Sequence, residues 1–153
     1  YGTELGLEGR SDPDNRRDFP WGKLDKDYEV KEAYPFEKEI YDHTRNMIRI
    51  RRTNDALSAG HFVCLYVDYF LLVFLRYIGE NIIAGFHNGW LDMPSDIAVD
   101  IGNNPNLPRR IKEKLADAHL VSLLGGPSYS IREGRLSLLL GGKSGVILTP
   151  AEE

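Results

Sequence analysis

The sequence contains one cysteine, Cys64, so no disulfide can form within the chain. It also lacks a long hydrophobic run, because the apolar segment 62–74 is interrupted by Asp68 and is too short to span a bilayer. The formal net charge of -4 gives no basic excess for contact with a polyanion. We therefore expect no membrane and no nucleic-acid partner. The lone cysteine and the absence of a leader at Tyr1 favour the cytoplasm.

Motifs for catalysis or for binding a metal are also lacking. The Gly-Lys-Ser run at 142–144 is similar to the end of a phosphate-binding loop, but Ser137 occupies the position of the first glycine. The acidic segments that begin at Asp12 and Asp25 lack the later ligands or the turn glycine of a calcium loop. The 4 histidines are too far apart for paired metal ligands. The sequence therefore predicts no catalytic residue, no metal site and no cofactor in this chain.

The first part of the sequence, residues 1–59, combines a loop with a helix. Residues 1–34 are rich in turn-forming residues and show no sustained period, which predicts a long loop. From Pro35 to about Ala59 the sequence has a helical period. Its apolar positions near one face are Phe36, Ile40, Met47, Ile50 and Leu57. The opposite, charged face is typical of a solvated helix surface, so this helix needs a partner for its apolar face only.

The second part, residues 60–153, has the pattern of an all-β domain. Apolar residues alternate with a period of two in short runs between glycine-rich turns. We predict strands at 62–66, 70–77, 82–86, 96–101, 120–124, 135–140 and 146–148, with a turn at 78–81. A short amphipathic helix is expected within 106–119, starting at Pro108. The fold class is therefore mainly β, an antiparallel β-sandwich, with Cys64 as a buried structural thiol.

The opening loop carries the residues best suited to a ligand. Its glycines allow a sharp exit from a strand, and the Asp-Pro step at 12–13 sets a turn from which Asp12 and Arg16 can both project. A guanidinium fork beside a carboxylate suits sugar hydroxyls, which need directional donors and acceptors. The alternative is that Asp12 and Arg16 pair with each other and hold the loop.

These segments resemble the alpha-amylase family of glycoside hydrolases, family 13, and within it the neopullulanases, maltogenic amylases and cyclomaltodextrinases. In that family the last strand of a (βα)8 barrel leads into Tyr-Gly-x-Glu-(Ile/Leu)-Gly and then Asp-Pro-x-x-Arg, matched here by 1–6 and 12–16. The runs 48–51 and 54–57 resemble the last barrel helix and its exit. The runs 120–126 and 136–148 resemble the last strands of the amylase C-terminal domain.

The resemblance implies that residues 1–59 are the end of a catalytic (βα)8 barrel and that residues 60–153 are a C-terminal β-sandwich domain. It implies a full-length enzyme that hydrolyses α-glucosidic bonds of starch-derived oligosaccharides with retention, through carboxylates that precede Tyr1. This chain alone is then expected to be inactive. The implied partners are an α-glucan oligosaccharide and the missing barrel, and the implied substrate-binding residues are Asp12 and Arg16. Glu4 and Trp21 fit a structural role equally well.

Two other functions remain open for the β-domain. A carbohydrate-binding module needs exposed aromatic rings, but Trp90 is the single tryptophan of this part, and Tyr66, Tyr69 and Tyr77 lie in strand patterns typical of a core. A purely structural or dimerisation domain is the other possibility. An apolar helix face without its barrel would be sticky, so we expect this chain to form a homo-oligomer.

Overall fold

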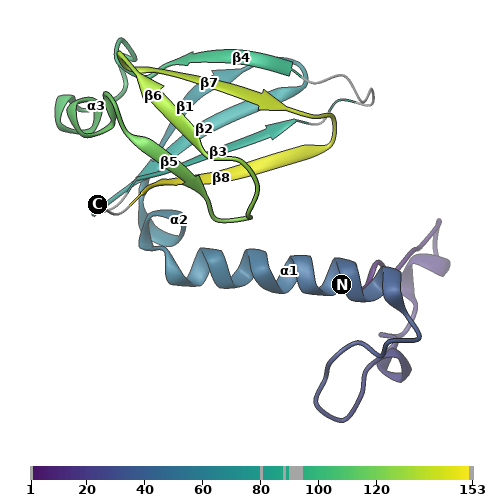
Figure 1. Cartoon of the computed structure of the whole chain (residues 1–153). Helices are drawn as coiled ribbons and strands as arrows, with labels where there is room; N and C mark the ends of the chain where they lie inside the picture. The colour runs from purple at the N-terminus through teal and green to yellow at the C-terminus, as the bar shows by residue number, and fades with distance from the viewer. Residues whose placement is uncertain (1, 80, 88, 90–94, 152–153) are drawn as a thin grey trace. The chain divides into compact units, whose positions relative to one another are not determined.

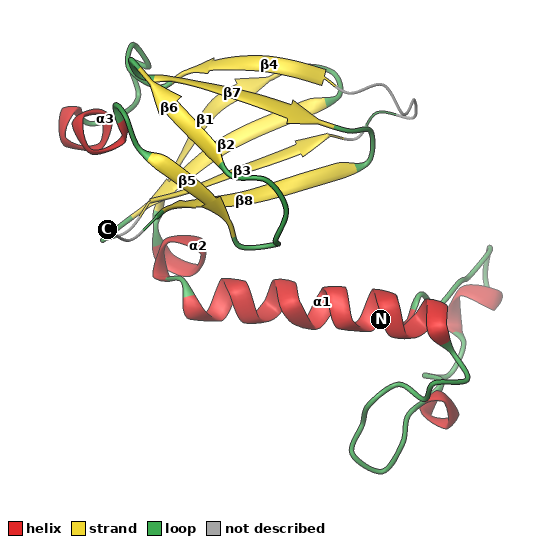
Figure 2. Ribbon diagram, viewed as in Figure 1, coloured by secondary structure: helices red, strands yellow, loops and turns green. Residues whose placement is uncertain are grey.

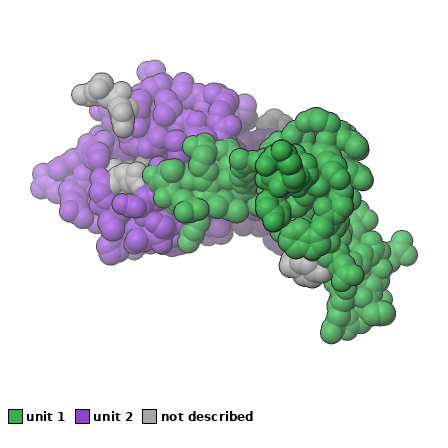
Figure 3. Space-filling view, turned by 90° about the horizontal axis from the view of Figure 1, so that it is seen from below, with its two compact units in different colours: residues 1–53 green, residues 54–153 purple. Residues whose placement is uncertain are grey.

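The computed structural model describes residues 2–79, 81–87, 89 and 95–151. It divides into two compact units, Tyr1–Thr53 and Asn54–Glu153, which Figure 3 colours separately. The sequence placed the division after residue 59, whereas the chain divides here after Thr53. Which domains of a larger enzyme these units represent stays a prediction. Trp90 and Glu80, which belonged to the predictions above, lie outside the described residues.

Unit 1 contains one long helix, α1 (Pro35–Thr53), preceded by an irregular segment with short 3-10 turns at Thr3–Leu5 (η1), Asp14–Arg16 (η2) and Trp21–Lys23 (η3). Turn η1 lies against α1. A methyl group built on Gly6, which has a φ of 62°, would come within 2.8 Å of Ile40 Cδ1 on that helix. Leu5 of η1 is buried, with 1% of its surface exposed. The opening segment is thus packed and does not trail as a free tail.

The charged face of α1 holds the loop 23–31, which the antiparallel bridge between Leu24 and Val30 closes. Arg45 Nη1 donates to both carboxylate oxygens of Glu29, at 2.6 and 2.7 Å. Lys23, at the start of the loop, forms an ion pair with Glu37 in the first turn of α1. Arg45 is still 60% exposed, so this face is accessible to solvent as predicted, and loop carboxylates from outside the helix pattern pair with it.

The helix predicted for residues 35–59 is interrupted. Helix α1 ends at Thr53, and a separate short helix, α2, covers Asp55–Ala59. Asn54 between them is extended, with φ -127° and ψ 107°. Asparagine competes with helical backbone hydrogen bonding and favours helix starts, which explains a break at this residue. The apolar period continues across the break, so the pattern alone suggested one helix.

Unit 2 is mainly antiparallel β-structure, as predicted, and Figures 1 and 2 show its strands around a common interior. Its strands are β1 (His61–Val67), β2 (Leu71–Tyr77), β3 (Asn81–His87), β4 (Ser95–Asp100), β5 (His119–Ser122), β6 (Tyr129–Arg132), β7 (Arg135–Leu140) and β8 (Ser144–Pro150). The described strands form one sheet in the order β1-β2-β3-β8-β5-β6-β7-β4. Its two outer strands, β1 and β4, also contact each other. The two faces of the predicted sandwich are therefore parts of one continuous sheet that curls almost into a barrel.

Strand alternation places the core of unit 2 inside this curled sheet. In β2 the odd-numbered positions from Leu71 to Tyr77 are buried, and in β7 the even-numbered positions from Leu136 to Leu140 are buried. Helix α3 (Arg109–Leu115) follows Pro108, as predicted, and buries Ile111 and Leu115. Burial of each such aliphatic side chain contributes about 1.5–3 kcal/mol, so the interior supplies the main stabilisation of this unit.

Part of the outer face of the sheet is covered as well. Ile82 of β3 pairs with Arg76 of β2 on the face away from the core, yet its side chain is 0% exposed. Helix α2 contacts both strands, and Arg76 Nε donates to the Gly60 carbonyl just after that helix at 3.1 Å. Cys64 was predicted to be buried, but its exposure is intermediate, because its neighbour Val63 takes the core-facing position of β1 and successive side chains of a strand point to opposite faces. No helix among the described residues has the length and apolar character needed to cross a membrane.

Candidate functional site

The structure brings the two predicted ligand residues together at turn η2, with Arg16 in the turn and Asp12 just before it. Arg16 Nε lies 3.0 Å from Asp12 Oδ1, and Arg16 Nη2 lies 3.5 Å from Asp12 Oδ2. Both side chains are largely exposed, at 78% for Arg16 and 64% for Asp12. The two residues therefore do pair with each other, as the alternative interpretation expected. An exposed pair of this kind contributes little stability, so a ligand with hydroxyl groups can replace it at small cost.

A second ion pair, which the sequence did not single out, organises the same loop. The Asp14 carboxylate accepts hydrogen bonds from Arg17 Nε at 3.0 Å and from Arg17 Nη2 at 2.7 and 2.9 Å. It also accepts the backbone N–H of Arg10 at 3.1 Å. Asp14 thus ties both ends of the segment 10–17 together. The spacing of Asp14 and Arg17 is a signal that could have predicted this pair, because a helical turn brings residues three apart onto one side.

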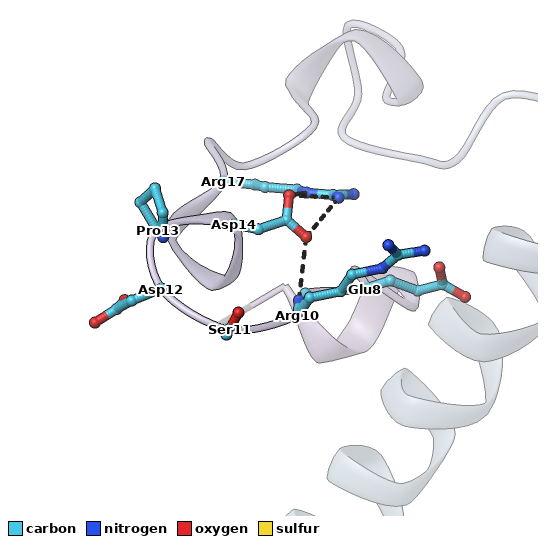
Figure 4. A pocket seen from close by; sticks show the side chains of 8 residues that line it. Glu8, Arg10, Ser11, Asp12, Pro13, Asp14 and Arg17 are labelled. Atoms are coloured by element: carbon cyan, nitrogen blue, oxygen red, sulfur yellow. Dashed lines mark hydrogen bonds and ion pairs between the residues drawn. The ribbon is translucent and has the colours of Figure 1, made fainter.

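Asp12 of the first pair and both members of the second pair line an open pocket of about 690 Å³. Its lining is mostly polar and comes from one stretch of chain: Glu8, Gly9, Arg10, Ser11, Asp12, Pro13, Asp14 and Arg17. In Figure 4 the Asp12 side chain points away from the Asp14–Arg17 pair, so the predicted ligand residue lies at the rim and the second pair forms a wall. A methyl group on Gly9 would come within 2.8 Å of Asn15 Cα, so this glycine permits the close approach that shapes the pocket.

The Asp14 carboxylate is ionised more readily than an ordinary aspartate. Its pKa is lowered first by the hydrogen bonds from the Arg17 side chain and then by the bond from the Arg10 amide. A lowered folded-state pKa means that its contribution to stability is present above the ordinary aspartate pKa and is lost as the pH falls through the folded-state value. The pocket wall therefore keeps its charge pattern at neutral pH.

We expect Arg17→Gln to raise the pKa of Asp14 toward its ordinary value, because it removes the largest cause of the shift. The measurement is an NMR titration of the Asp14 carboxyl carbon in both proteins. Arg16→Gln serves as the matched control, since Arg16 pairs with Asp12 and not with Asp14. Equal Asp14 midpoints in the wild type and in Arg17→Gln would contradict the assigned cause.

The remaining loop residues give a less specific picture. Trp21 is 64% exposed and its ring lies against Phe19, with the centroids 4.5 Å apart. Glu4 lies in η1 and is partly buried. Within the described ranges no group of three or more metal-ligating side chains occurs. The chemistry that this loop offers is thus hydrogen bonding from paired charges.

The fold and this loop together define the class of the chain. It superposes on the debranching enzyme of Nostoc punctiforme with a TM-score of 0.67 and 30% identity, over 97% of this chain and 27% of that enzyme. The same enzyme has also been solved after soaking with acarbose. No protein-family model matches the chain. The chain is a relative of the alpha-amylase-family glycoside hydrolases and resembles their C-terminal part.

Particular relatives agree with this class. The chain is 29% identical over 97% of its length to an amylopullulanase of Thermoanaerobacterium saccharolyticum, of which it spans 11%. It is 35% identical over 58% of its length to a cyclomaltodextrinase of Thermoanaerobacter pseudethanolicus, of which it spans 14%. The resemblance drawn from the loop motifs is thereby confirmed. Because the chain spans such a small share of each relative, the activity of a whole enzyme is a matter for proposal.

Proposed function

We propose that this chain is the C-terminal portion of a retaining hydrolase, similar to neopullulanases, that cleaves α-glucosidic bonds in starch-derived oligosaccharides. The observation that carries the proposal is the similarity over nearly the whole chain to an amylopullulanase, joined to an Asp-Pro-x-x-Arg loop that presents an exposed carboxylate and guanidinium. Retaining hydrolysis needs a nucleophilic carboxylate and a general acid about 5 Å apart. We assign neither group to this chain, which is therefore inactive by itself.

In this proposal Asp12 and Arg16 bind glucosyl hydroxyls on the donor side of the scissile bond. Arg16 supplies donors and Asp12 supplies acceptors, so the pair can serve both hydrogen-bonding roles of a hydroxyl group. Their exposure supports the assignment, since both side chains are accessible and can exchange their mutual ion pair for hydrogen bonds to a sugar. Asp14 and Arg17 have a positioning role, because they fix the segment 10–17 from which the first pair projects.

The test uses the enzyme that contains this chain and the substitutions Asp12→Asn and Arg16→Gln. Each removes a charged hydrogen-bonding group, and we expect kcat/KM for maltooligosaccharides to fall about 10–100-fold, which corresponds to about 1.5–3 kcal/mol per charged hydrogen bond. Arg109→Gln is the control, since Arg109 is a 91% exposed arginine that pairs with Glu113 on α3 of unit 2. The isolated 153-residue chain should release no reducing sugar.

Two results would contradict this proposal in different ways. Unchanged kinetics in both loop variants would remove Asp12 and Arg16 from substrate binding but leave the enzyme class standing. Sustained release of reducing sugar by the isolated chain would mean that the catalytic carboxylates lie within it.

We also infer that the rest of a catalytic barrel is the partner of α1. Unit 1 buries few apolar side chains, among them Leu5 and Val30, while Phe36 and Ile48 of α1 are 65% and 54% exposed. A long amphipathic helix obtains most of its stability from packing, so these exposed positions need a surface. When the barrel is absent, we expect a second copy of the chain to cover this helix, so that the isolated chain self-associates.

A further inference from the structure

The turn between β1 and β2 displays an aromatic residue that the sequence placed in the core. Tyr69 was predicted to be a core residue within a strand pattern, but it lies outside both strands and is 92% exposed. Phe70 beside it is 48% exposed, and the two rings meet edge to face with centroids 4.8 Å apart. The prediction failed because Asp68 ends the first strand and reverses the chain before Leu71. A ligand that covers this ring would gain the free energy of removing its apolar surface from water.

Asp68 makes this turn rigid. Its Oδ1 atom accepts the backbone N–H groups of Phe70 at 2.8 Å and of Leu71 at 2.7 Å. Its own N–H donates to the Leu71 carbonyl at 2.9 Å, and the Tyr66 hydroxyl donates to its Oδ2 at 2.9 Å. The turn is therefore held by side-chain and backbone bonds together. Tyr69 is presented from a fixed backbone, so little conformational entropy is lost when a ligand settles on its ring.

The ring of Phe70 is supported from inside the domain. It stacks on the ring of His87 in β3, with the centroids 6.4 Å apart and the planes 16° from parallel. His87 is 4% exposed, and its Nδ1 atom accepts the backbone N–H of Gly89 at 3.0 Å. Phe70 is thus anchored to a buried group, while Tyr69 extends beyond it into solvent.

The turn combines the two features that a sugar requires. The flat face of a pyranose packs on an exposed aromatic ring, and its hydroxyl groups need directional acceptors and donors nearby. Asp68 Oδ2 and the Tyr66 phenol oxygen can each accept a further hydrogen bond next to the Tyr69–Phe70 pair. We propose that residues 66–70 form a second binding site for an α-glucan chain, separate from the Asp12–Arg16 loop. This inference rests on the proposed function for the identity of the sugar.

The carboxylate at this site stays charged at neutral pH. The pKa of Asp68 is lowered first by the backbone N–H of Phe70, then by that of Leu71, and further by the Tyr66 hydroxyl. It therefore remains an acceptor under all conditions in which a starch-active enzyme is assayed near neutrality.

The test is an NMR titration of the 153-residue chain with maltoheptaose, following the ring signals of Tyr69. We expect those signals to shift on binding, and Tyr69→Ala to weaken the affinity about tenfold, the loss of one stacked ring. Tyr69→Phe should retain most of the affinity, since it keeps the ring. Phe62→Ala is the matched control, because Phe62 is a 55% exposed aromatic residue of β1 that lies outside the turn. The shifts at Tyr69 should persist in Arg16→Gln, which alters only the loop.

Three results overturn the inference. The first is that the Tyr69 ring signals of the wild type do not shift with maltoheptaose, and the second is that Tyr69→Ala binds maltoheptaose as tightly as the wild type. The third is that the Tyr69 signals shift with protein concentration in the absence of sugar, which would indicate a contact between copies of the chain. The proposed function is tested separately by maltotriose hydrolysis in the enzyme that contains this chain, where the control Phe62→Ala should leave kcat/KM unchanged. An enzyme that does not cleave α-glucans would overturn the proposed function, while the titration would still decide the turn.

Discussion

Replacing Leu138 with alanine should destabilise unit 2 by about 2–5 kcal/mol, the cost of removing a buried leucine side chain and leaving a cavity. Leu138 is 0% exposed and belongs to the central core cluster. It extends across the interior from β7 toward β3, where a methyl group built on Gly85 would lie 3.6 Å from its Cδ1 atom. The strands on both sides of Leu138 belong to one hydrogen-bonded sheet. They therefore cannot easily move inward to fill the cavity that the alanine leaves.

The next residue along the strand supplies the control. Leu139 has the same chemistry and the same strand, but its side chain points outward and is 59% exposed. Leu139→Ala should change stability by no more than about 0.5 kcal/mol, as for most surface positions. Urea unfolding of the chain, followed by circular dichroism, measures both variants. If Leu138→Ala and Leu139→Ala lose the same stability, strand propensity and not burial determines the contribution of these leucines in β7.

Replacing Gly134 with alanine should cost about 2–4 kcal/mol, because steric strain in the left-handed region adds to a backbone clash. Gly134 has a φ of 74°, and a Cβ there would lie 2.9 Å from Gly102 Cα and 3.1 Å from Gly102 N. Its carbonyl accepts the N–H groups of Ile101 and Gly102, and its N–H donates to the Ala116 carbonyl. The neighbouring backbone therefore has no room to move without losing hydrogen bonds.

Two other glycines separate the strain from the clash. Gly125 has a φ of 81° but no atom within 4 Å of an added Cβ, so Gly125→Ala should cost only about 1–2 kcal/mol of strain. Gly22 has neither a positive φ nor a close neighbour, so Gly22→Ala should be neutral or stabilising by up to about 1 kcal/mol. Thermal unfolding of the three variants gives the comparison. If Gly134→Ala lowers stability no more than Gly125→Ala does, the Gly102 backbone moves away from the added methyl group without measurable cost.

Much of the β-domain could be predicted from the period of its apolar residues. Strand β7 alternates perfectly between exposed and buried positions, and such a pattern leaves one choice of buried face. Strand β6 was missed because its four residues include one aliphatic side chain, Ile131, which is too little for a period to show. That short strand is also what joins the two faces into a continuous sheet, since it pairs with both β5 and β7. The sequence therefore indicated the mainly β fold class, but it did not indicate that β6 joins the two faces into one sheet.

The loop site was predictable in part for a different reason. Asp12 and Arg16 stand out by residue type and spacing, and the structure does bring them together. The pairing of Asp14 with Arg17, and the amide bond from Arg10, depend on the 3-10 turn at 14–16, which the residue pattern does not distinguish from an open loop. Tyr69 shows the same limit, because the hydrogen bonds of Asp68 that turn the chain are not visible in an alternating pattern.

The position of β8 in the sheet has a consequence for how unit 2 folds. Strands β1, β2 and β3 follow one another in sequence and pair through short turns, so they can form early as a local meander. Strand β8, whose pairing begins at Ser144, inserts between β3 and β5 and joins segments far apart along the chain. During synthesis β3 therefore exposes an unpaired edge until β8 has left the ribosome. We expect β8 docking to be the slow step of folding, and the interval before it to be the time of greatest risk of aggregation.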